Sequence, residues 1–72
     1  MERLERHNQG KATAQVLAHV ERAKDSLKNI HAGNLSSDDV FIHPQMQLVS
    51  LKVAREELNK AIGLMERTRW TR

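Results

Sequence analysis

Apolar residues recur at intervals of three and four along two long stretches of the chain, and the single proline stands at the start of the second stretch. In a helix of about 3.6 residues per turn this spacing puts the apolar side chains on one face, so each stretch predicts an amphipathic helix. We expect a first helix over about residues 11–32, a loop over 33–43 and a second helix over about 44–69. Residues 1–10 have one large apolar residue besides Met1, Leu4, and are expected to form a flexible arm.

Two helices of similar length joined by a loop of about ten residues predict an all-α fold, an antiparallel two-helix hairpin with coiled-coil-like packing. The apolar stripes identify the residues expected at its seam. These are Val16, Val20, Ala23, Leu27 and Ile30 in the first helix, and Leu51, Ala54, Leu58, Ala61 and Met65 in the second.

The ends of the helices also have sequence signals. Gly33 and Asn34 are residue types that adopt the left-handed conformation at helix ends, so we expect them to stop the first helix. Pro44 is expected at the first position of the second helix, where its missing N–H costs nothing, because a proline pushes the preceding residue, His43, toward extended geometry.

The apolar surface exceeds what one hairpin can bury. A chain of 72 residues has a thin core, and without cysteine it has no disulfide to compensate. A second set of apolar residues lies away from the main stripes and is expected to bind a partner. It consists of Leu17, Met46, Val49, Val53 and Leu64. We therefore expect a homo- or hetero-oligomer, with a four-helix arrangement completed by self-association, such as a dimer, or by another protein.

Charge and hydropathy limit the kinds of partner that the chain is expected to bind. The net charge is +3, and three of the bases, Arg67, Arg69 and Arg72, lie in the last six residues, so the rest of the chain is balanced. This argues against a broad nucleic-acid surface, although Arg67, Arg69, Trp70 and Arg72 could together grip phosphates and stack on a base. The commoner role of a terminal tryptophan is to cap the end of the hairpin. No apolar run reaches the ~18 residues of a membrane span, and a cytoplasmic location is expected.

The sequence predicts no catalytic, metal or cofactor site. His7, His19, His31 and His43 recur every twelve residues, which on a helix turns each about 120° from the last. A set of His31 and His43 with Asp38 or Asp39 is conceivable at the loop, but no spacing typical of metal ligands supports it. The serines and glutamates lack the surroundings that activate a nucleophile or pair an acid with a base, so an enzyme is not expected.

The order of segments resembles the small co-chaperones of type III secretion needle subunits, which are cytosolic helical hairpins. The similarity lies in Leu4-Glu5, in Val20-x-x-Ala23-x-x-x-Leu27-Lys28, in the break at Gly33 and in Gln47-x-x-x-Leu51-x-x-Ala54-x-x-Glu57-Leu58-x-x-Ala61-Ile62. The segment from Asn34 to Pro44 is longer than is usual in that family, and Met46 stands where an aromatic residue is common. The resemblance implies binding to a helical-repeat chaperone, so that the pair keeps a needle subunit from polymerising in the cytosol.

The expected function is therefore that of a non-enzymatic protein-interaction module, of which the co-chaperone is one form. Two alternatives remain open at this point. One is a small dimeric nucleic-acid-binding protein that uses the basic C-terminal tip, and the other is a homodimeric regulatory or scaffold bundle.

Overall fold

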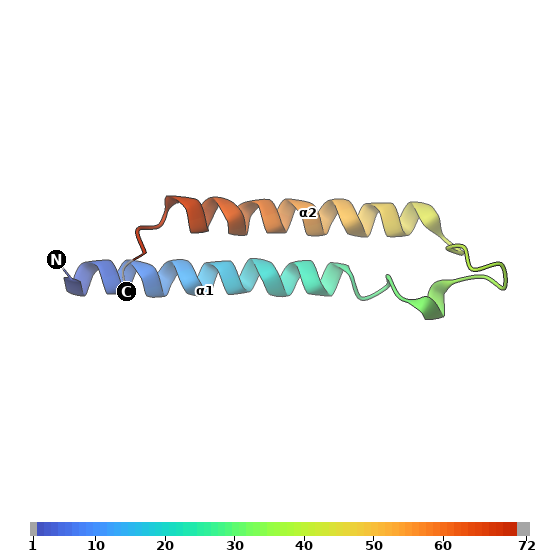
Figure 1. The fold of residues 1–72 in the computed structure, drawn as a ribbon, viewed down its shortest axis with the longest axis horizontal. Helices are drawn as coiled ribbons and strands as arrows, with labels where there is room; N and C mark the ends of the chain where they lie inside the picture. The colour runs from blue at the N-terminus through green and yellow to red at the C-terminus, as the bar shows by residue number, and fades with distance from the viewer. Residues whose placement is uncertain (1, 71–72) are drawn as a thin grey trace.

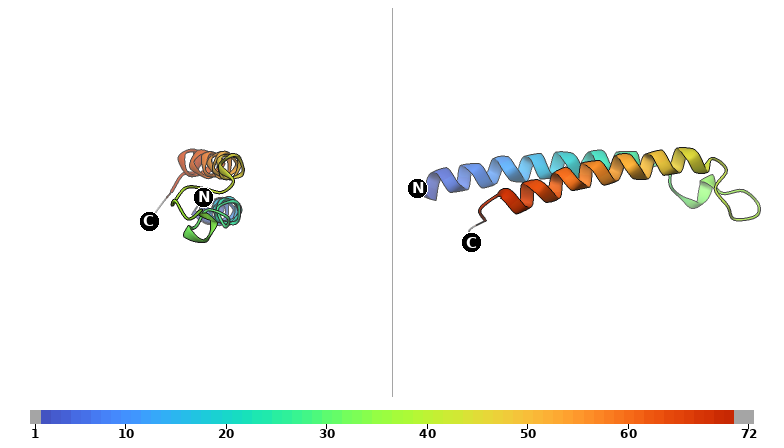
Figure 2. Two further views of the ribbon diagram at one scale, coloured as in Figure 1. Left: turned by 90° about the vertical axis from the view of Figure 1, so that its right-hand side faces the viewer. Right: turned by 90° about the horizontal axis from the view of Figure 1, so that it is seen from above.

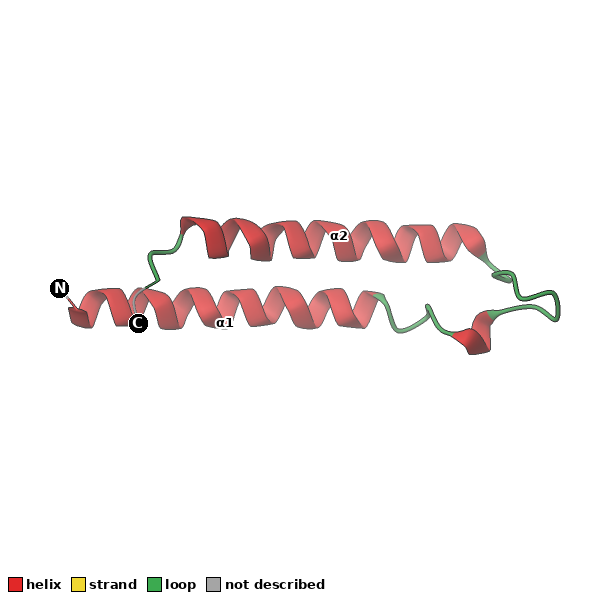
Figure 3. Cartoon of the chain, in the orientation of Figure 1, coloured by secondary structure: helices red, strands yellow, loops and turns green. Residues whose placement is uncertain are grey.

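Two long helices lie side by side and antiparallel in a computed structural model that describes the backbone of residues 2–70 and the side chains of residues 6–70 (Figure 1). Helix α1 spans Glu2–Ser26, a short 3-10 helix η1 spans Ala32–Asn34, and α2 spans Pro44–Arg67. Apart from an isolated bridge between Leu35 and Phe41, the described residues form no strand (Figure 3). The predicted antiparallel hairpin is thus confirmed. It is a rod of 59 × 16 × 15 Å (Figure 2).

Helix α1 begins at Glu2 and not near residue 11, so residues 2–10, which were expected to form a flexible arm, are helical; Met1 lies outside the described residues. A helix that is already packed from Gln9 onward can extend without a new nucleation step, and Glu, Arg and Gln are good helix formers. Gly10 is tolerated inside the helix at a cost of about 1 kcal/mol. Near its start the helix is tied down by Gln9, whose Nε2 donates to the carbonyl of Arg69 at 2.9 Å.

Helix α1 ends at Ser26 rather than near residue 32. The N–H groups of Lys28 and Ile30 bond to carbonyls three residues back, at 3.3 and 3.0 Å, so the last turn tightens and the helix stops. Gly33 does not take the left-handed conformation. Its N–H donates instead to Nδ1 of His31 at 3.1 Å at the start of η1, and the described residue with positive φ is Asp39, at 61°.

Helix α2 begins where the sequence predicts. Pro44 is its first residue and His43 precedes it with φ −127°. The helix ends at Arg67, two residues before the expected end, because Thr68 closes it. Both the N–H and the Oγ1 of Thr68 donate to the carbonyl of Leu64, at 3.1 and 2.6 Å, and the chain then continues extended.

The contact between the helices is made of small side chains. The buried apolar residues are Ala12, Ala23, Ala54 and Ala61, which include three alanines predicted for the seam. The larger predicted seam residues of α2 lie outside it. Leu51, Leu58 and Met65 are 49%, 41% and 47% exposed, because the helix is turned so that alanines, not leucines, face α1. The predicted seam residues Val16, Val20, Leu27 and Ile30 of the first stripe are half-buried.

This packing predicts that the seam cannot accept a larger side chain. Ala54 is 3% exposed, and Ala54→Leu would force the helices apart, so we expect a loss of about 1–3 kcal/mol in the free energy of unfolding. Urea denaturation followed by circular dichroism measures it. The matched control is Ala14→Leu, at an exposed position of α1, where a change within about 0.5 kcal/mol is expected. Equal stability of Ala54→Leu and the native chain would contradict a close-packed seam.

Candidate interaction surface

The seam follows a seven-residue repeat in both helices, whose positions we label a to g with the seam residues at a and d. From residue 6 onward, where side chains are described, every residue at these positions is buried or half-buried. On the α1 side they are Gln9, Ala12, Val16, His19, Ala23, Ser26 and Ile30; on the α2 side they are Gln47, Ser50, Ala54, Glu57, Ala61, Leu64 and Thr68. In coiled coils the residues at a and d are mainly large and apolar. Here, however, most of the seam positions are small or polar.

A histidine and a glutamate meet at the middle of the seam. The Nδ1 of His19 donates to Oε2 of Glu57 at 2.6 Å, and the two side chains are 17% and 15% exposed. Arg22 and Lys60 each approach the same carboxylate to 3.9 Å. The hydrogen bond from His19 is the largest influence on Glu57 and, with the nearby cations, holds the pKa of this carboxyl below its usual value despite the opposing effect of desolvation.

Near the loop, the side chain of Gln47 ties α2 to the segment that follows α1. It is 5% exposed, and its Nε2 donates to the carbonyl of Asn29 at 3.0 Å. The Nδ2 of Asn34 donates to the same carbonyl. Among the described residues the Oε1 of Gln47 has no hydrogen-bond partner. Together with the pair His19–Glu57, this contact fixes the register of the hairpin, since in both contacts the residue numbers add to 76.

A polar groove of about 650 Å³ runs along one side of the seam. It is lined by Gln15, Ala18, His19, Arg22, Asn59, Lys60, Gly63, Leu64 and Arg67. Residues at position g of both helices, just before each a, take part in this lining. The g positions of α1 and α2 therefore share one side of the hairpin, which is basic at Arg22, Lys60 and Arg67 and apolar toward the loop, at Met46 and Val53.

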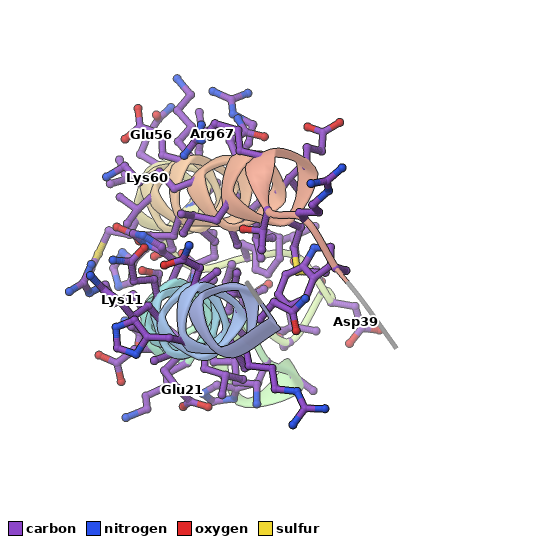
Figure 4. The ribbon with its side chains drawn as sticks, turned by 90° about the vertical axis from the view of Figure 1, so that its left-hand side faces the viewer. Lys11, Glu21, Asp39, Glu56, Lys60 and Arg67 are labelled. Carbon is purple, nitrogen blue, oxygen red and sulfur yellow. The ribbon has the colours of Figure 1, made fainter. Side chains whose placement is uncertain are left out.

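The e and b positions lie on the other side and carry large apolar residues. We call this surface the apolar face and define it as Leu17, Val20, Leu27, Leu48, Leu51, Leu58, Ile62 and Met65. Six of the eight are between 41% and 57% exposed. Seen along the hairpin, Lys11, Glu56 and Lys60 project on one side of the helix pair, and Asp39 of the loop lies on the other (Figure 4).

The five residues predicted to bind a partner do not form one surface. Leu17 belongs to the apolar face, whereas Leu64 is half-buried at the seam. Met46, Val49 and Val53 lie together on the other flank of α2 and are 59%, 60% and 44% exposed; we call them the small apolar patch. Met46 and Val49 line a recess of about 320 Å³ with Gln45 and Ser50.

The basic C-terminal tip is folded back on the open end of the hairpin. The indole N–H of Trp70 donates to the carbonyl of Met65 at 2.9 Å, and the carbonyl of Arg69 accepts from Gln9. Arg67 lines the polar groove. The side chain of Trp70 thus bonds to the last turn of α2, while Arg72 lies outside the described residues.

The other polar candidates of the sequence are dispersed. His7, His19, His31 and His43 lie in three different segments of the chain, and the Nδ1 of His31 is engaged with Gly33. Within the described part of the chain, no three His, Asp or Glu side chains are grouped so that they could hold a metal ion. Nor is any helix there long and apolar enough to cross a membrane.

The sequence reasoning missed the buried Gln47, the pair His19–Glu57 and the exposure of Val40, Phe41 and Ile42 at the loop, which are 58%, 40% and 53% exposed. A signal for the first two was available. The small and polar residues repeat with the same alternation of three and four as the leucines, one position away.

Comparison with known proteins finds no match. No family model matches the chain, and neither the curated proteins nor the solved structures contain a similar one. The resemblance to co-chaperones of needle subunits therefore stays a prediction from the sequence.

The lowered pKa of Glu57 predicts an acid-sensitive hairpin. A group whose pKa is lower in the folded state adds stability above its unfolded value, here about 4.5, and this contribution is lost as the pH falls through the folded value. We expect the free energy of unfolding of the native chain to fall more steeply below about pH 4.5 than that of Glu57→Gln. Urea titrations at several pH values measure both slopes, with Glu56→Gln as the exposed control. Parallel slopes for the native chain and Glu57→Gln would contradict the role of this pair.

Proposed function

We propose that this protein is a non-enzymatic protein-interaction module, which completes its core by packing exposed apolar side chains against helices outside the chain. One observation carries the proposal: among the described side chains the buried apolar residues are four alanines, while most of the leucine, isoleucine, valine and methionine side chains of α2, together with Leu17 of α1, are exposed. Apolar surface of this extent is typical of interaction sites on small proteins.

The total exposed surface supports the same proposal. The chain exposes 6056 Å², whereas a compact monomer of 8.3 kDa exposes about 4,600 Å². The radius of gyration is 17.0 Å, against about 11 Å for a compact domain of this length. The single hairpin thus exposes about 1,500 Å² more solvent-accessible surface than a compact protein of the same mass.

The resemblance in the sequence suggests one partner for this module, a helical-repeat chaperone of a needle subunit, and with it a cytoplasmic site of action. The small apolar patch is suited to such a partner. Its three side chains lie within two turns of α2, and the recess beside Met46 and Val49 can accept an apolar side chain from a neighbouring helix.

The proposal predicts that charges in the small apolar patch abolish partner binding. Val49→Asp with Val53→Asp places two carboxylates at exposed positions, so the helix content should be unchanged while the affinity for a purified helical-repeat chaperone falls at least about 30-fold. Titration calorimetry measures the affinity and circular dichroism the helix content. The control is Lys52→Asp, an exposed polar position of the same helix. Undiminished binding by the double variant would show that the patch is not the contact.

A test of the module itself needs no partner. A monomeric hairpin that hides apolar surface only by docking should bind the dye ANS and melt with low cooperativity. Bright dye fluorescence that disappears on association is the expected result. A monomer that melts cooperatively and binds no dye would contradict the proposed function.

A further inference from the structure

We propose that a second copy of this chain covers the apolar face, with α1 of each copy lying against α2 of the other, so that two hairpins form a four-helix bundle. The inference rests on the proposed function and names a partner for one of the two apolar surfaces. It leaves the small apolar patch outside the bundle.

The position of the apolar stripes on the helices indicates a bundle rather than a lone pair. A helix that touches one neighbour needs apolar residues at a and d, whereas a helix between two neighbours needs a wider stripe that also takes in e. On both sides of the seam large residues stand at e and are turned to the same side: Val20 of α1 with Leu27 just after it, and Leu51, Leu58 and Met65 of α2. Each stripe thus lies between the side that packs on the other helix of the hairpin and a side where a helix of a second copy could pack.

The area to be covered is that of an obligate dimer. Each chain exposes about 1,500 Å² more than a compact protein of its mass. Two copies have about 3,000 Å² of such excess between them, so even two thirds of it, covered in a dimer, would reach the range of roughly 2,000–5,000 Å² for obligate homodimers. A twofold arrangement uses the same surface on both copies and so closes without apolar surface left over on this side.

The shape of the face favours α1 against the partner's α2. At the open end α1 presents the small residues Gly10 and Thr13, while α2 presents the large residues Ile62 and Met65 at the same height. A twofold axis along the bundle places the small residues of α1 at that end against the large residues of the partner's α2. It also puts both loops at the same end and makes all neighbouring helices antiparallel.

The charges beside the face are compatible with this pairing. Lys24 is paired with Glu21 at 3.5 Å within α1, and Lys28, just after α1, is paired with Asp25 at 2.7 Å, so a second copy meets little repulsion there. Arg55 lies at position b, at the same height as Glu21 by the register of the hairpin. When α2 of one copy packs on α1 of the other, Arg55 and the partner's Glu21 lie at neighbouring edges of the two helices.

The first test compares two double variants of the full chain by sedimentation equilibrium. Leu58→Asp with Ile62→Asp changes the apolar face, and Val49→Asp with Val53→Asp is the matched control, with the same spacing, helix and charge and similar exposure. We expect the native chain and the control to have twice the mass of 8.3 kDa, and the face variant to lose the dimer with at least about a 100-fold rise in dissociation constant. Dissociation of the control, alone or together with the face variant, would overturn the assignment of the interface to this face.

The second test uses a chain with the native apolar face and so does not depend on the folding of that variant. The sequence has no cysteine, so Ser37→Cys in the loop gives one spin label per copy. Electron–electron distance measurements should place the two labels within the combined width of two hairpins, each 16 Å across. A separation near the 59 Å length of the hairpin would overturn the pairing of α1 with the partner's α2.

The oligomeric state of the native chain separates this inference from the proposed function. A native chain that is monomeric and binds ANS would overturn the proposed dimer but agree with the proposed function as an interaction module. A cooperatively melting monomer that binds no dye overturns both. A dimer that dissociates only in the face variant supports both.

Discussion

The close approach of α1 to α2 through small side chains determines the rest of the structure. Alanines at the seam bring the two helix axes near enough for His19 to reach Glu57 and for Gln47 to reach Asn29. The same alanines leave little to bury, since hydrophobic stabilisation grows with the apolar area removed from water. The leucines that would supply that area are turned to one side, where a single chain has nothing to cover them.

The polar contacts of the seam determine the register of the two helices more than they stabilise the fold. A half-buried hydrogen-bonded pair and a buried glutamine contribute little net free energy, because each gives up its hydration. A shift of one helix along the other would leave these groups unpaired, so they favour a single register. The hairpin is held in one alignment by His19, Glu57 and Gln47, while the free energy of burial has to come from outside the pair.

The sequence was sufficient for the fold class, the antiparallel arrangement and the start of α2 at Pro44, because apolar periodicity and proline geometry are local signals. It was not sufficient for the rotation of each helix about its axis. Two stripes, one of leucines and one of alanines, run side by side on α2, and propensity alone does not tell which faces the neighbour. The outward face of Leu51 and Leu58 could be identified only once the seam was known. Nor could periodicity reveal that the side chains of Asn34 and Gln47 both donate to the carbonyl of Asn29, just after α1, because this is a tertiary contact.

The loop end and the open end of the hairpin differ in how far apart their contacts lie along the chain. Gln47 and Asn29 are 18 residues apart, whereas Gln9 and Arg69 are 60 apart. Closing the longer segment first costs about 1 kcal/mol more in chain entropy than closing the shorter one. The helices should therefore zip from the loop toward the termini as the chain folds, and strain or truncation at the termini should mainly speed unfolding.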